Sequence, residues 1–412
     1  MITKLKHLGP GLLFAGAAIG VSHLVQSTRA GADFGLGLLW ALLLVNLFKY
    51  PFFQYGPRYV AATGESLIDG YKKLGKGILG IYYVLSIGTM FTIQTAVTIV
   101  TAGLASNLFG NIAPFTVGNR TITSIESWTI VISLVCVLLL IIGKYNLLDR
   151  LMKLIIITLT ISTIIAVSFA FGNNEAPLSF SQILPKNTLE ITFLIAFMGW
   201  MPAPLDVAVW HSLWAVEKKQ ENKNYKSALF DFNIGYISTI ILGIGFLLLG
   251  ALVMFNSGET FSNSAGKFAG QLINMYKQSL GDWAYIIIAI AAFTTMFSTT
   301  LTTLDASPRT MAKASELLFN KNTFSKYSFW IVVLFFGTIL IFLFLASEMG
   351  LLIRIATILS FITAPFFAYI NFKLISGKHT PKEWHPNKNM KILSWCGITF
   401  LVGFSVWYLT TL

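Results

Sequence analysis

Long apolar runs with short polar connections dominate this 412-residue sequence. Each run is close to the roughly 20 residues that a helix needs to cross about 30 Å of hydrocarbon. Hydrophobic residues make up 55% of the chain and charged residues only 11%, a balance that would leave large apolar patches on a soluble protein. The sequence therefore predicts an all-α integral membrane protein with eleven transmembrane helices and no separate soluble domain. The runs lie at 9–31, 34–57, 77–109, 125–143, 147–171, 189–215, 228–255, 283–304, 327–346, 350–374 and 392–411.

The 29 Lys and Arg residues are distributed unevenly along the chain. Most fall in the N-terminal tail and in the even-numbered connections, which predicts a cytoplasmic N-terminus and an extracytoplasmic C-terminus in the cell (inner) membrane. A cysteine placed at Lys223 should therefore react only from the cytoplasmic side. The same bias explains the net charge of +12 without a nucleic-acid partner. The basic residues in spans or external loops are Arg29, Lys49, Arg120, Lys186, Lys267, Lys277 and Arg354.

Helix-breaking residues interrupt the first and the sixth run near their centres. The first run contains Gly20-Val21-Ser22-His23, and the sixth contains Met201-Pro202-Ala203-Pro204. Proline removes a backbone donor and disfavours helical geometry in the residue before it, so the sixth span should unwind locally. Non-helical backbone survives at membrane depth only where it faces protein or a water-filled cavity. The two breaks therefore predict a binding site between them, although ordinary proline and glycine kinks would also fit.

The breaks are five spans apart, a spacing that is typical of two inverted repeats with the site at their interface. We expect the first repeat at 1–171 and the second at 187–374. The remaining residues, 375–412, would form a cytoplasmic connection and one extra helix.

Short motifs along the whole chain carry a family resemblance, through their order and spacing. They are Gly9-Pro10-Gly11, Phe34-Gly35, Leu39-Trp40, Arg58, Thr63-Gly64, His211-Ser212, Asp231, Ser298-Thr299-Thr300-Leu301-Thr302 and Pro365-Phe366. In this respect the chain resembles the Nramp divalent-metal transporters. The resemblance implies a LeuT-type fold of two inverted five-helix repeats and the transport of a metal ion.

The chain departs from that family where the family binds its metal. Gly20-Val21-Ser22-His23 stands in place of the family's Asp-Pro-Gly-Asn motif in span one. Met201-Pro202-Ala203, or Ala203-Pro204-Leu205-Asp206 in a shifted register, replaces Met-Pro-His in span six. The family's acidic residue in span three has no counterpart, since Gln94 lies in that region. Proton coupling by the family's route is therefore not indicated, although His23 or His211 could titrate.

Seven residues are the candidates for substrate binding: Gly20, Ser22, His23, Gln94, Met201, Ala203 and Asp206. Of these, Asp206, Met201 and His23 offer a carboxylate, a thioether and an imidazole to a metal. Each has a structural alternative. His23 could make a structural hydrogen bond, Asp206 could cap the outgoing half-helix, and Met201 could simply pack against apolar neighbours. Gln94 could bond between helices.

The hydroxyl groups of span eight are candidates for a coupling ion. Thr299, Thr300 and Thr303 could hold sodium against carbonyls of the unwound first span, as hard cations prefer oxygen ligands. A helix interface would explain the same threonines. His211, two turns beyond the second break, is a candidate for gating or for a proton path.

These observations favour secondary active transport of a small inorganic ion. A divalent metal cation of the Mn/Fe/Mg class is the main expectation, as the resemblance implies. A small anion such as bicarbonate, with sodium coupling as an option, is the alternative, because the first span lacks a carboxylate and helix N-termini can hold anions. A non-transporting receptor or scaffold is a third reading. We expect no enzyme activity, no cofactor beyond the transported ion and coupling H+ or Na+, and no partner beyond that ion and the lipid bilayer.

Overall fold

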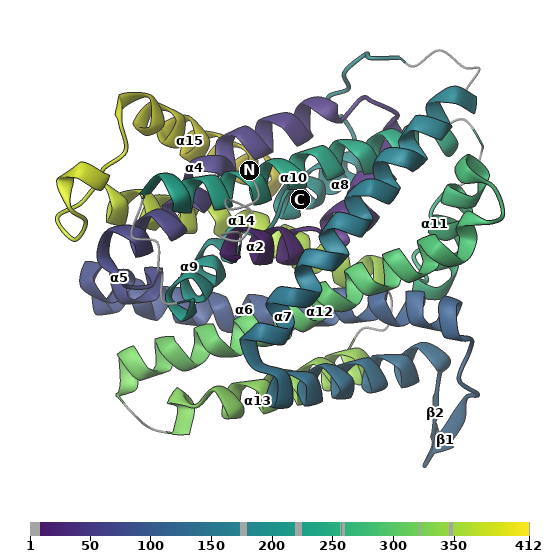
Figure 1. The fold of residues 1–412 in the computed structure, drawn as a ribbon, viewed down its shortest axis with the longest axis horizontal. Coiled ribbons are helices and arrows are strands. Elements are labelled where there is room, and N and C mark those ends of the chain that lie inside the picture. The colour runs from purple at the N-terminus through teal and green to yellow at the C-terminus, as the bar shows by residue number, and fades with distance from the viewer. Residues whose placement is uncertain are drawn as a thin grey trace.

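A computed structural model describes most of the chain, and most of the described residues are helical (Figure 1). The described residues are 9–173, 179–218, 225–255, 257, 260–320, 323–345 and 349–411. The short helix α2 lies at the centre of the bundle, where it contacts α7, α9, α10 and α12. The α-helices are α2 (Pro10–Ala18), α3 (Thr28–Phe34), α4 (Leu39–Thr63), α5 (Leu67–Leu74), α6 (Lys76–Phe109), α7 (Ser124–Asn173), α8 (Thr188–Trp200), α9 (Val207–Glu217), α10 (Tyr225–Val253), α11 (Ala265–Leu280), α12 (Ala284–Phe319), α13 (Tyr327–Leu340), α14 (Met349–Ile375) and α15 (Lys388–Thr411).

Shorter elements complete the chain. Two π-helical segments, η1 (Ser22–Ser27) and η3 (Ile341–Leu345), continue longer spans. Two 3-10 turns, η2 (Thr323–Ser325) and η4 (Lys382–Trp384), lie in connections. Within the described part of the chain, six helices are long and apolar enough to cross a membrane, and the pair Pro10–Ala18 and Ser22–Phe34 adds a seventh span bent by 45°.

Both halves of the first span pack tightly against α10 through glycines. A Cβ atom on Gly11 would lie 2.1 Å from the carbonyl oxygen of Asp231, and one on Gly235 would lie 2.1 Å from the carbonyl oxygen of Gly11. Further along the contact between the first span and α10, a Cβ atom on Gly31 would lie 2.0 Å from the carbonyl oxygen of Leu247. Small residues allow helix backbones to approach closely inside a membrane. This packing holds the first span beside α10.

A carboxylate fixes the N-terminal end of α2. The Asp231 Oδ1 atom accepts a hydrogen bond from the Gly9 amide at 3.0 Å, and its Oδ2 atom accepts one from the Gly11 amide at 2.8 Å. Negative charge is favourable at a helix N-terminus, where backbone amides lack helical partners. Asp231, one of the residues that carry the family resemblance, therefore fixes the N-terminal end of α2. It lies away from the breaks in the first and sixth spans.

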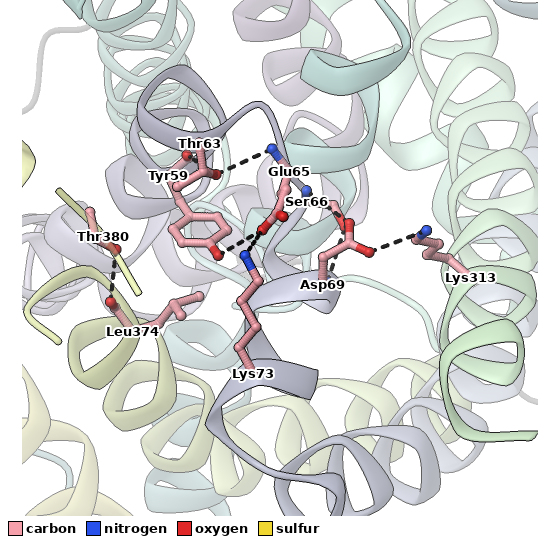
Figure 2. Close-up of polar contacts among 9 residues, drawn as sticks. All are labelled: Tyr59, Thr63, Glu65, Ser66, Asp69, Lys73, Lys313, Leu374 and Thr380. Atoms are coloured by element: carbon pink, nitrogen blue, oxygen red, sulfur yellow. Dashed lines mark hydrogen bonds and ion pairs between the residues drawn. The ribbon is translucent and has the colours of Figure 1, made fainter. Parts of the chain in front are cut away.

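Ion pairs and hydrogen bonds join the connection after α4 to neighbouring helices (Figure 2). Lys73 pairs with Glu65, and the Tyr59 hydroxyl donates to Glu65 at 3.3 Å. Asp69 forms a capping box with Ser66 at the start of α5 and pairs with Lys313 of α12 at 3.2 Å. These contacts tie α5 to α12.

Three sequence-based boundaries were wrong. The second span begins at Leu39 instead of 34, because Gly35, with φ +57°, turns the chain before α4. Spans four and five form a single helix in the structure, α7, which bends so that its two halves run in different directions (Figure 1). The sequence between them, 143–147, contains no proline to stop helical hydrogen bonding. The helix α12 continues 15 residues beyond the expected end at 304.

The all-α expectation also missed a short hairpin. Strand β1 (Phe115–Val117) pairs antiparallel with β2 (Arg120–Ile122) across a two-residue turn at Gly118 and Asn119. Gly118 has φ +61°, as hairpin turns of this length require. Alternating β-branched residues around Gly-Asn were the available signal.

Candidate ion site

Both expected breaks are present and line one cavity. In the first span the helix is interrupted at Ile19 and Gly20, between α2 and η1. In the sixth span, 201–206 separate α8 from α9. The cavity has a volume of about 20 Å³, enough for one water-sized occupant. Its lining includes Ala18, Val21 and Ser22 from the first break, Trp200, Pro204 and Val207 from the second, and Thr299 and Thr303 from α12.

The two polar residues after the first break lie side by side but face different neighbours. Ser22 lines the cavity, and its hydroxyl lies 2.6 Å from both the Ala18 carbonyl oxygen and His23 Nδ1. The His23 ring is fully buried, and its Nε2 atom donates to the Thr239 carbonyl of α10 at 2.9 Å. Both ring nitrogens of His23 thus have protein partners. His23 joins η1 to α10, as the structural alternative expected.

Gly20 allows α12 to approach the first break. A Cβ atom at Gly20 would lie 2.6 Å from the Thr299 Oγ1 atom. That hydroxyl lies 3.3 Å from the Gly16 carbonyl oxygen and 3.2 Å from the Ile19 carbonyl oxygen. A threonine hydroxyl therefore meets carbonyls at the end of α2. This contact fits a helix interface as well as a coupling-ion site, so the sodium site stays a prediction.

The other two span-eight candidates bond to α6. Thr303 lines the cavity and donates to Gln94 Oε1 at 2.6 Å. The Thr300 hydroxyl lies 2.7 Å from the Thr101 hydroxyl, at the α6 interface. Gln94 also donates to the Thr300 carbonyl at 3.3 Å. Gln94 and Thr300 thus make the helix-helix hydrogen bonds that were their structural alternative.

The second break surrounds a buried lysine that the sequence analysis did not select. Lys49 of α4 is fully buried, and its ammonium group donates to the carbonyls of Met198 and Gly199, both at 2.8 Å. It also donates to the carbonyls of Met201 at 3.1 Å and Ala203 at 3.2 Å. Two of the substrate-binding candidates, Met201 and Ala203, thus have their carbonyl oxygens engaged by Lys49.

Asp206 lies at the other end of the same break. It precedes α9 but makes no side-chain capping hydrogen bond, and its buried Oδ1 atom has no hydrogen-bond partner among the described residues. Asp206 and Lys49 interact electrostatically. Lys49 lies at the C-terminal end of α8 and Asp206 at the N-terminal end of α9. Each charge is favourable there, because a helix is negative at its C-terminus and positive at its N-terminus. Asp206 is the acidic side chain at this break that retains an unused acceptor.

His211 lies away from the cavity. It is buried on α9, and its ring centre lies 5.7 Å from that of Phe14 and 5.9 Å from that of Phe232. Its Nδ1 atom has no hydrogen-bond partner among the described residues. The surroundings are aromatic, so a proton path through His211 stays a prediction.

A second, larger cavity begins one turn beyond the first, along the same two spans. Its volume is about 400 Å³, and it is lined by Gln26 and Arg29 from the first span, Thr192 and Ala196 from α8, and Asn263 and Arg354. Arg29 donates to Asn263 Oδ1 at 3.2 Å and interacts electrostatically with Asp33. Arg354 is exposed. Two guanidinium groups therefore line this cavity.

The donor set near the breaks is poor for a transition metal. Within the described residues, no group of three His, Cys, Asp or Glu side chains is arranged to hold a metal ion. The residues that line the smaller cavity supply hydroxyl groups and indole rings but no carboxylate. The Met201 side chain is fully buried, and its sulfur lies 3.3 Å from the position of a Cβ atom on Gly243.

Lys49, Arg29 and Arg354 are the residues that sequence reasoning missed. All three appeared as exceptions to the charge bias. An ionisable residue inside an apolar span is costly unless it has partners, so it suggests a functional site. That signal was sufficient to select Lys49. Its carbonyl partners, 149 to 154 residues away, were not visible in the sequence.

Comparisons with known proteins agree with this fold. A family model described as natural resistance-associated macrophage protein-like (Nramp) matches residues 11–411. An uncharacterized protein of Pasteurella multocida (strain Pm70) is 36% identical over 417 residues, which cover 99% of this chain and 92% of that protein.

Two solved structures share the fold at low identity. A mutant of the Eremococcus coleocola manganese transporter has a TM-score of 0.73 and 14% identity, covering 98% of this chain and 86% of that one. MhsT in complex with L-phenylalanine has a TM-score of 0.66 and 13% identity, with 98% of both chains covered. With the family model matched over nearly its whole length, this chain is a multi-pass membrane protein that belongs to the Nramp family.

Proposed function

We propose that this protein is a secondary active transporter that carries a small inorganic ion by alternating access. The observation that supports it most directly is the cavity that the breaks of the first and sixth spans line together. The proposal includes eleven spans, with inverted repeats at 1–171 and 187–374 and an additional helix in 375–412. A receptor or scaffold would give no reason for paired breaks at membrane depth.

For the substrate, we propose a divalent metal cation of the Mn/Fe/Mg class, on the strength of family membership. Asp206, Met201 and His23 are the proposed ligands, with Gly20, Ser22, Gln94 and Ala203 around them. His23 would have to exchange one of its two hydrogen bonds for the metal, so it is a weaker candidate than Asp206. Asp206 supports this proposal best, because its Oδ1 atom has no partner among the described residues. A hard ion such as magnesium would keep part of its water shell and so need few protein ligands.

Uptake by purified protein in liposomes tests the proposal directly. Manganese, magnesium and bicarbonate are compared with and without sodium and pH gradients. Uptake of manganese or magnesium above that of empty liposomes would support a metal transporter, and dependence on either gradient would identify the coupling ion. We propose Thr299 and Thr303 for sodium; Thr300, bonded to α6, is a weaker candidate. No uptake of any of these ions would contradict the transport proposal.

A small anion such as bicarbonate is the second candidate. The larger cavity favours it, because Arg29 and Arg354 line that cavity and its described lining carries no carboxylate. Clefts lined by one sign of charge concentrate the opposite ion. The smaller cavity favours it too, since hydroxyl donors such as Ser22 suit an anion.

Arg354→Gln should distinguish the two candidates by a change in KM. If the substrate is an anion, loss of this charge should raise KM several-fold at low ionic strength, and added salt should reduce the difference. If the substrate is a dication, KM should fall instead. Initial uptake rates at varied substrate concentration are the measurement. Lys186→Gln removes an exposed charge that is not part of the cavity lining, so it should leave KM unchanged.

The proposed orientation can be tested with a membrane-impermeant thiol reagent. Lys223, the position expected to react from the cytoplasm, lies outside the described residues. Lys382 in η4 and Thr116 in β1 are exposed, and these two positions are used for labelling instead of Lys223. In a Cys396→Ser background, a cysteine at Thr116 should react on intact cells, and one at Lys382 only after permeabilisation. The opposite pattern would reverse the orientation.

A further inference from the structure

Lys49 has the surroundings of a bound cation. Four backbone carbonyl oxygens, from Met198, Gly199, Met201 and Ala203, lie between 2.8 and 3.2 Å from its nitrogen. The residue has no exposed surface. An ammonium group has three donors and no acceptor, so it suits a site made only of acceptors, with one N–H shared between two of the four carbonyls. A neutral amine would direct its lone pair at carbonyl oxygens, which is unfavourable.

The carbonyls belong to backbone that the break leaves without helical partners. Met198 and Gly199 lie in the last turn of α8, where carbonyls have no amide donors within the helix, and Met201 and Ala203 lie in the non-helical stretch. Unpaired carbonyls at membrane depth must be satisfied from elsewhere. Rings of backbone carbonyls also hold dehydrated monovalent cations in other membrane proteins. The second break therefore provides a cation site, and its occupant is attached to α4.

We infer that Lys49 is a tethered cation: its ammonium group fills a four-carbonyl site at the second break that would otherwise take a free monovalent cation. The break thus carries one positive charge of its own, which interacts electrostatically with Asp206, whichever ion is transported. The carbonyls of Met201 and Ala203 are consequently engaged before a substrate arrives. This inference goes beyond the transport proposal and does not depend on it.

Chemical rescue of Lys49→Ala tests the inference on purified protein. The substitution removes the cation and leaves space for a small amine. We expect it to lower the melting temperature by at least about 5 °C, because it leaves buried carbonyls unpaired. Propylammonium, which has the three carbons and the nitrogen that the substitution removes, should restore at least half of that loss with a saturable concentration dependence. Fluorescence of the ten tryptophans reports the transition.

Three controls separate a cation site from general packing. Tetramethylammonium has the same charge but no N–H donor, so it should not rescue Lys49→Ala. Lys49→Met keeps an apolar stem in place and lacks the charge, so it should be destabilised and insensitive to propylammonium. Lys391→Ala removes an exposed lysine on α15 and should match the wild type.

The result that supports the inference is rescue of Lys49→Ala by propylammonium and not by tetramethylammonium. Wild-type stability in Lys49→Met would overturn it, since the stem alone would then be sufficient. A loss in Lys49→Ala that propylammonium does not reduce would overturn it as well. If Lys49→Ala yields no folded protein, the same comparison is made on the yield of monodisperse protein from cells grown and solubilised with each amine. None of these stability measurements requires transport. A result that overturns the inference about Lys49 would therefore leave the transport proposal unaffected.

Discussion

Asp206→Asn should abolish the uptake of a divalent metal cation in liposomes while leaving the protein folded. The substitution keeps the side-chain size and removes the negative charge beside the second break. Two unit charges 4 Å apart interact by about 4 kcal/mol at an effective dielectric of 20, and a dication doubles the effect. The Lys49 ammonium at the same break would then lose the opposite charge with which it interacts. We expect at least about a hundredfold loss in apparent affinity for the metal.

The same variant has the opposite expectation for an anion. Bicarbonate uptake should persist or improve in Asp206→Asn, because the remaining charge at the break is positive. Asp282→Asn, on a side chain that is 89% exposed, is the matched control and should behave as the wild type with either ion. Manganese or magnesium uptake that survives Asp206→Asn unchanged would refute the metal proposal. The melting temperature of each variant shows whether lost uptake reflects unfolding.

Gly250→Leu should prevent the protein from folding. A Cβ atom at this position would lie 2.2 Å from the Thr28 carbonyl oxygen and 3.0 Å from the Ala32 amide nitrogen. Both are backbone atoms of α3, so no side chain can move aside, and the first span would have to separate from α10. Separation would also move η1, and with it the cavity. We expect loss of the monodisperse peak in size-exclusion chromatography of detergent-solubilised protein.

Gly88→Leu is the matched control for this effect. Gly88 lies exposed on α6, with no atom within 4 Å of an added Cβ. The intrinsic change in helix propensity is the same for both substitutions and favours leucine. Gly88→Leu should therefore give a wild-type elution profile. A monodisperse Gly250→Leu with an unchanged melting temperature would show that the close contact between α3 and α10 is not required.

Hydropathy and proline chemistry were sufficient to predict much of this architecture. The length of the apolar runs indicated membrane helices, because the bilayer sets a minimum length that can be counted along the chain. Pro202 and Pro204 located the second break for an equally local reason, since each removes a backbone donor. The first break was predicted at Gly20–His23, whereas the helix is interrupted at Ile19 and Gly20 and Ser22–Ser27 is π-helical.

Side-chain partners could not be obtained in this way. Thr299 and Thr300 are adjacent in sequence, yet one meets carbonyls of α2 and the other bonds to Thr101 of α6. Asp206 stands where a helix cap is expected, but its side chain makes no capping bond. Each outcome depends on the rotation and spacing of packed helices.

The sequence by itself determined that this is a membrane protein with breaks in its first and sixth spans. These properties follow from transfer free energies and backbone chemistry that act within one segment. Only the tertiary structure decided that Lys49 of α4 fills the carbonyl site at the second break and that Arg29 and Arg354 share a cavity. Such contacts join residues more than a hundred positions apart, so they exist only after the helices have packed.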